Sequence, residues 1–83
     1  MSNPRLNELF TLKEAAGILG RKEYVLWYHA KTNVHHEEMG YRKFLTKEAM
    51  VKIAKEHMVL RDGEKLEDIL ARIEEAAKAK KAA

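Results

Sequence analysis

Histidine and cysteine are the side chains that most often hold zinc, and this sequence has four histidines and no cysteine. His35 and His36 are neighbours, so in a strand they point to opposite faces rather than toward one metal ion. His57 is expected to lie on the inner face of a helix. We therefore expect neither a metal site nor a bound cofactor.

Nucleophilic and acid–base catalysis find no more support. The only serine is Ser2, near the N-terminus, and no histidine is spaced to pair with a nucleophile. The acidic pairs Glu37–Glu38 and Glu74–Glu75 fall at a predicted hairpin tip and on a predicted exposed helix face, where carboxylates are common. The sequence also has no glycine-rich phosphate loop. We expect the protein not to be an enzyme.

Basic and aromatic side chains offer a different chemistry, the recognition of nucleic acid. Lysine and arginine bind phosphates, and an aromatic ring can pack on a sugar or on a thymine methyl group. The candidate DNA contacts are Lys13, Arg21, Lys22, Tyr24, Trp27, Tyr28, Lys31, Tyr41, Arg42 and Lys43.

Several of these residues also have an ordinary structural interpretation. Trp27 and Tyr28 are adjacent on a predicted helix and point about 100° apart, so both cannot be fully buried. The ordinary arrangement buries one ring and partly covers the other, whereas the alternative is a contact with DNA or a protein. Likewise, Arg42 and Lys43 are either phosphate contacts or exposed residues of a strand edge.

The stretch 10–30 predicts two short helices joined by a tight turn. Thr11 and Glu14 have the spacing of a capping box, and Gly20 suits a left-handed helix end. We expect helices over 13–19 and 22–30, with Asn33 in a left-handed conformation after the second. Two short helices in this order are the outline of a helix-turn-helix.

The remaining residues predict a hairpin and two further helices. Residues 34–44 favour a short hairpin with its tip at Glu37–Glu38, because strand-forming residues flank this acidic pair and Gly40 interrupts a helix. A third helix is expected to begin at Thr46 and end at Asp62–Gly63. The residues expected on its inner face are Met50, Ile53, Ala54, His57 and Leu60.

A fourth helix begins near Leu66, and its apolar stripe continues through Ile73, Ala76 and Ala77. We expect the stripe to close the core as far as about Ile73. These last three residues are the candidate surface for a second copy or a protein partner. The expected organisation is a flexible arm (1–9), a folded domain (10–72) and a C-terminal helix extension that frays (73–83).

Composition limits the choice of partners. The 83-residue chain has room for one small domain and carries a net charge of +3, with its basic excess in residues 1–63. An apolar run of the roughly 20 residues needed to span a bilayer is absent, and so is a signal-peptide pattern. We expect a cytoplasmic protein with no membrane partner.

A set of residues across the chain matches a known family pattern. These residues are Leu12, Glu14, Ala15, Ala16, Gly20, Leu26, Tyr28, Gly40, Tyr41, Arg42, Phe44, Ile53, Leu60, Gly63, Leu66, Ile69 and Leu70. Together they resemble the N-terminal DNA-binding domain of MerR-type regulators and, more loosely, the excisionase-type winged helices of phages and mobile elements. The resemblance covers residues 10–72.

The resemblance implies a mainly α winged helix-turn-helix, ordered helix, helix, short β-hairpin, helix, helix. It implies that the second helix enters the major groove of double-stranded DNA and that Arg42 binds phosphate from the wing. Where such families often have an arginine contact, this sequence has Trp27. The long dimerisation coil and effector domain of full-length MerR regulators have no counterpart.

We therefore expect a small DNA-binding protein without an effector domain, sequence-specific or architectural, of a phage or mobile element. It would act as a transcription regulator, and its last helix would offer a surface for a homodimer or a protein partner. One alternative is a protein-interaction module on the same fold, which would use Trp27, Tyr28 and the last helix. Another is a phage DNA-packaging subunit of the small-terminase type.

Overall fold

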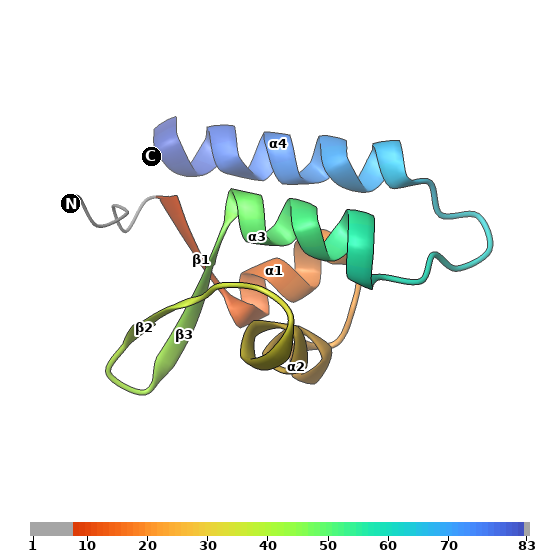
Figure 1. The fold of residues 1–83 in the computed structure, drawn as a ribbon. Helices are drawn as coiled ribbons and strands as arrows, with labels where there is room; N and C mark the ends of the chain where they lie inside the picture. The colour runs from red at the N-terminus through yellow and green to blue at the C-terminus, as the bar shows by residue number, and fades with distance from the viewer. Residues whose placement is uncertain (1–7, 83) are drawn as a thin grey trace.

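In the computed structural model, which describes residues 8–82, the helices pack together and a small antiparallel sheet lies at one side of them (Figure 1). Residues 1–7, which make up most of the predicted arm, lie outside this range. In chain order the elements are β1 (Leu9–Thr11), α1 (Leu12–Leu19), α2 (Glu23–Thr32), β2 (Glu37–Met39), β3 (Arg42–Thr46), α3 (Lys47–Lys52), the π-helical segment η2 (Ile53–His57) and α4 (Leu66–Ala82).

Helix α1 begins and ends where the sequence predicts. The Thr11 hydroxyl accepts the Glu14 N–H at 3.0 Å, and the Glu14 carboxylate accepts the Thr11 N–H at 2.9 Å. Gly20 closes the helix with a φ of 68°, in the left-handed region that residues without a Cβ adopt easily. These two ends fix the angle at which the chain enters and leaves the helix.

The core lies around α1, which packs against both α2 and α4 (Figure 1). Helix α4 runs along the opposite side of α1 from α2 and also covers α3. The largest side chains that are fully buried come from all four α-helices, from η2 and from β3: Leu19, Leu26, Leu45, Met50, Ile53, Ile69 and Ile73.

The sheet contains a strand that the sequence analysis did not anticipate. Strand β1 pairs antiparallel with β3, and β3 also pairs with β2, so the strand order is β1-β3-β2. Leu9 was assigned to a flexible arm but is the buried first residue of β1. The hairpin is thereby joined to the residues that lead into α1.

Two turns differ from the prediction. Asn33 is right-handed, with φ −117° and ψ −28°, because its backbone N–H and its side-chain amide both bond to His29. The hairpin turns at Gly40–Tyr41 and not at Glu37–Glu38, which lie in β2. Gly40 has a φ of 64°, a value that glycine adopts readily in a tight turn.

The third helix is shorter than predicted. It ends at His57, and Leu60 lies exposed in the connection to α4. The Arg21 side chain bonds the Val59 carbonyl at 2.8 Å, which helps to hold this connection outside the helix. The prediction that the helix runs to Asp62–Gly63 is therefore wrong.

The fourth helix begins at Leu66, where the sequence predicts. Helix α4 continues to Ala82, and Lys80 near its end bonds the Glu14 carboxylate at 2.9 Å. Ile73 is fully buried, so it belongs to the core and not to a partner surface. Ala76 and Ala77 are partly buried against the core. Within residues 8–82, no helix is both long and apolar enough to cross a membrane.

The burial of Ile73 gives a direct test of the core. We expect Ile73→Ala to lower the free energy of unfolding by about 2–5 kcal/mol, because it leaves a cavity between α4 and its neighbours. Urea denaturation followed by circular dichroism measures the change. Ala79→Ser, at an exposed position of the same helix, is the control and should change stability by less than about 0.5 kcal/mol. An equally small effect at Ile73 would contradict its place in the core.

Candidate functional site

A groove of about 490 Å³ lies between the start of α1, helix α2 and the β2–β3 hairpin. We call it the α2–hairpin groove. Its lining residues are Thr11, Leu12, Lys13, Glu23, Trp27, Tyr41, Arg42 and Lys43. Five of them are candidate DNA contacts, so the fold gathers side chains that are widely separated in the sequence.

The charged groups of the groove are mostly basic. Lys13 and Arg42 are exposed, whereas Lys43 is largely covered and bonds Glu38 at 3.3 Å. Glu23, in the first turn of α2, adds one carboxylate. The groove therefore combines three cationic groups with a single acidic group, a balance that attracts an anionic ligand.

The aromatic side chains of α2 lie on its outer surface. Trp27 is 46% exposed, Tyr28 57% and Tyr24 71%. The arrangement with one of the adjacent rings in the core is therefore wrong, because Leu26, His29 and Ala30 supply the buried side of α2. A helix that leaves three aromatic rings exposed has a surface suited to contact with another molecule.

The remaining candidates on α2 are also accessible. Lys22 precedes the first residue of α2, and Lys31 lies in its last turn; both are exposed. The Lys31 ammonium group lies 4.8 Å from the centre of the Trp27 ring, within the range of a cation–π interaction. This contact places a positive charge over the ring that lines the α2–hairpin groove.

Arg21 is the exception among the candidates. Its guanidinium bonds both carboxylate oxygens of Glu64, at 2.7 and 2.8 Å, and 8% of its side chain is exposed. The structure corrects its predicted role, because these bonds tie the turn after α1 to the connection before α4. Sequence analysis missed Glu64, since nothing local indicates a partner so far along the chain.

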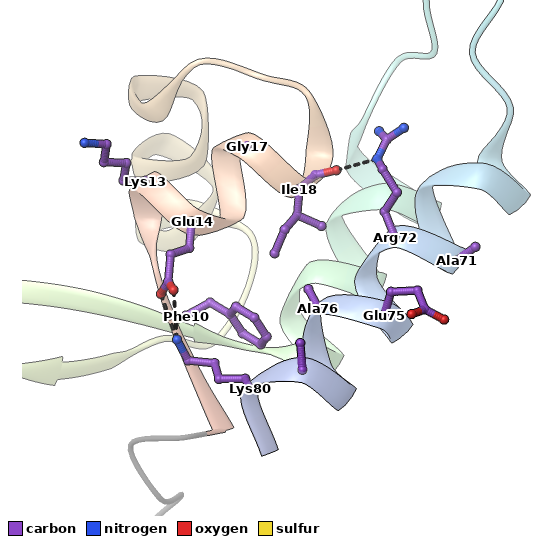
Figure 2. A pocket seen from close by; sticks show the side chains of 11 residues that line it. Phe10, Lys13, Glu14, Gly17, Ile18, Ala71, Arg72, Glu75, Ala76 and Lys80 are labelled. Carbon is purple, nitrogen blue, oxygen red and sulfur yellow. Dashed lines mark hydrogen bonds and ion pairs between the residues drawn. The ribbon is translucent and has the colours of Figure 1, made fainter. Parts of the chain in front are cut away.

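A second, larger groove lies between α1 and α4 (Figure 2). Three of its charged side chains already bond within the chain: Lys80 reaches Glu14, and Arg72 Nε donates to the Ile18 carbonyl at 2.9 Å. Phe10 and Ala76 contribute apolar surface. Because much of its charge is satisfied internally, this groove is suited to apolar contact rather than to phosphate.

The histidines form two separate groups. His29 is buried, and its pKa is lowered by burial and by His57, whose ring centre is 6.0 Å away. His35 and His36 lie before β2 and bond Glu37 and Glu38 respectively. Among residues 8–82, no group of three or more histidine, cysteine or acidic side chains is placed to hold a metal ion.

The bond to Arg21 predicts an acid-sensitive contribution to stability. It lowers the pKa of Glu64 to about 2, with help from the Arg61 backbone N–H. Since an unfolded glutamate titrates near 4.5, the stabilisation is complete above about pH 4.5 and is lost as the pH falls toward 2.

We expect the wild type to lose more stability between pH 5 and pH 3 than Glu64→Gln, because the variant has no proton to gain at this site. Urea denaturation at both pH values measures the difference. Glu56→Gln, at an exposed position, is the matched control and should behave like the wild type. An acid loss in Glu64→Gln as large as in the wild type would contradict the role of this pair.

Compared with known proteins, the chain matches no protein-family model, no curated protein and no solved structure. The expected likeness to MerR-type and excisionase-type domains therefore stays a prediction from the sequence. For the same reason, a function for the α2–hairpin groove has to follow from the side chains that line it.

Proposed function

We propose that this protein is a winged helix-turn-helix that binds double-stranded DNA, with α2 as the recognition helix and the β2–β3 hairpin as the wing. The observation that carries the proposal is the α2–hairpin groove. Lys13 from α1, Trp27 from α2 and Arg42 from the hairpin line this one concavity. A DNA strand lying in it would meet both positive charge and an aromatic ring.

In this arrangement the cations position the DNA, and α2 reads it. Arg42 on the hairpin and Lys13 at the start of α1 bind backbone phosphates, contacts that fix register without reading sequence. A phosphate bound by Lys13 would also lie near the start of α1, where backbone N–H groups and the helix dipole favour an anion.

Base recognition would depend on the exposed face of α2. Tyr24, Trp27 and Tyr28 offer apolar contact with thymine methyl groups and sugars, and Glu23 can accept a hydrogen bond from a cytosine amino group. The described part of α2 presents no arginine, asparagine or glutamine on this face before Asn33. Sequence preference would therefore come mainly from shape and apolar contact.

The biological role that fits this chemistry is that of a small MerR-like or excisionase-like protein, either a transcription regulator or an architectural factor. A packaging subunit of the small-terminase type would use the same surface within a larger oligomer. Because the net charge is only +3, affinity for random DNA should be modest, and a second copy or neighbouring protein on the DNA would strengthen it.

A protein-interaction module is the competing proposal, and the groove between α1 and α4 favours it. That groove has an apolar floor and internally bonded charges, as a protein-contact surface often does. Salt separates the two proposals, because apolar contact between proteins is insensitive to counterion release.

The first prediction concerns salt. If Lys13, Arg42 and Lys43 each neutralise a phosphate, log affinity should fall with log salt at a slope of about −2 to −3. Between about 50 and 200 mM salt this is a loss of roughly 15- to 60-fold. Fluorescence anisotropy with a labelled random-sequence duplex measures it. The absence of binding at about 50 mM would contradict the proposal and favour a protein partner.

The second prediction concerns the hairpin. We expect Arg42→Ala to weaken binding to all duplexes alike and to make the salt slope less negative by about 0.9, because one phosphate contact is removed. Arg61→Ala, which removes the same charge from the α3–α4 connection, is the matched control and should leave affinity nearly unchanged. A loss confined to one DNA sequence would contradict a phosphate role for Arg42.

The third prediction concerns α2. We expect Trp27→Ala to keep the helical circular dichroism spectrum, since the ring is half exposed, and to bind DNA about three- to tenfold more weakly. Val59→Ala, at an exposed apolar position away from the groove, is the control. Unchanged affinity in Trp27→Ala would remove this ring from the proposed interface.

A further inference from the structure

His36 lies between the recognition helix proposed above and the hairpin, and each of its ring nitrogens bonds a different element. Nδ1 is 2.6 Å from the carbonyl oxygen of Ala30, in the C-terminal part of α2. Nε2 is 2.9 Å from a carboxylate oxygen of Glu38, in β2. The ring therefore bridges α2 and the first strand of the hairpin.

Both partners of His36 are hydrogen-bond acceptors. A carbonyl oxygen has no proton to donate, and an ionised carboxylate has none either. Each bond therefore needs an N–H on the ring, but a neutral imidazole carries only one. The observed pair of bonds is complete only when His36 is the doubly protonated, positively charged imidazolium.

Glu38 is held in the ionised form that this arrangement requires. The pKa of Glu38 is lowered by its bond to His36 and by Lys43, whose ammonium group lies 3.3 Å from the same oxygen. Glu38 and Lys43 are direct partners in the β2–β3 register, and Lys43 lines the α2–hairpin groove. The contacts thus run from α2 through His36 and Glu38 to the groove.

The Ala30 carbonyl is a natural site for a positive donor. The Asn33 N–H bonds the His29 carbonyl, as the helical pattern requires, but the Val34 N–H bonds this same carbonyl instead of the Ala30 carbonyl that a continuing helix would offer it. Carbonyl groups at a helix C-terminus carry partial negative charge, so a cationic ring is favoured there.

We infer that His36 is a protonation-dependent positioning residue that holds the hairpin against α2 and thereby sets the width of the DNA-binding groove. The inference rests on the proposed function. When His36 loses its second proton, one of the two bonds is lost and the hairpin is free to move away from α2. DNA affinity should therefore be higher in mildly acidic solution than above neutral pH.

Other titratable groups lie near this contact. Glu38 faces it from β2 and Lys43, bonded to Glu38, from β3, whereas Glu37 bonds the adjacent His35. His29, buried in α2 with its ring 6.0 Å from that of His57, acts in the opposite direction. Because the pKa of His29 is lowered, acid tends to destabilise the fold there, so the test must include a measurement of folding at each pH.

The first arm of the test needs no DNA. Nuclear magnetic resonance measures the exchange of backbone amide protons in β2 and β3 of the full chain. The measurement is made at about pH 5.5 and pH 8, on either side of ordinary histidine titration, and the rates are corrected for intrinsic exchange. We expect hairpin protection relative to α1 to fall at the higher pH in the wild type and to be independent of pH in His36→Gln. Equal protection at both pH values in the wild type would overturn the inference.

The second arm measures affinity for a labelled duplex by anisotropy over the same pH range at fixed ionic strength. The wild type should bind about three- to tenfold more weakly at pH 8, the effect of one hydrogen bond. His36→Gln should show no such change, whereas His35→Gln, the matched control, should keep it. A pH response that persists in His36→Gln and vanishes in His35→Gln would overturn the inference.

The salt slope distinguishes positioning from direct contact. A positioning residue leaves the slope equal at both pH values, whereas a histidine that itself binds phosphate would make it more negative by about 0.9 at pH 5.5 and so contradict the inference. The proposed function can also fail separately: pH-dependent hairpin protection without DNA binding would support the role of His36 in the hairpin but reject DNA as the ligand.

Discussion

The burial of α1 is the constraint on which the rest of the structure depends. A helix of eight residues is too short to be stable alone in water, so its neighbours must supply the stabilisation. Ala15 and Leu19 are fully buried, and α2 and α4 pack against the helix from different sides. The capping box at Thr11 directs the chain from β1 into α1, and the left-handed Gly20 directs it from α1 toward α2. These two connections position the residues that α1 and α2 contribute to the α2–hairpin groove.

The structural features that the sequence predicted correctly are those that depend on residues close together in the chain. Capping, apolar periodicity and the turn at Gly20 are set by residues within one or two helical turns, and they predicted α1 and α2 closely. Strand β1 escaped prediction because its three residues become a strand only through pairing with β3, far along the chain. The end of the third helix escaped for a related reason, since the Arg21 bond to Val59 joins two distant connections.

The same distinction applies to the candidate site. Composition identified ten basic and aromatic residues, but it could not separate Arg42, which is exposed, from Arg21, which is held by Glu64. Both are arginines beside a predicted turn, and their difference lies in a carboxylate contributed by another part of the chain. Conversely, Trp27 and Tyr28 are exposed because Leu26 and Ala30 lie on the buried side of α2. Which side of α2 is buried depends on packing, and the sequence of α2 is too weakly amphipathic to predict it.

The hairpin is the part of the groove with the weakest connection to the core. Strand β2 is an edge strand, paired with β3 on one side, and a two-stranded hairpin has little stability of its own. Its turn residue Tyr41 is fully exposed, so core packing does not hold this end in place. Side-chain bonds between β2 and α2 therefore have a large influence on where the hairpin lies. His36 makes such bonds to both elements, and its two acceptors require a charge that depends on pH. One wall of the groove is built on packed helices and the other on a thin hairpin. The width of the groove therefore changes most easily through movement of the hairpin, where the contact made by His36 lies.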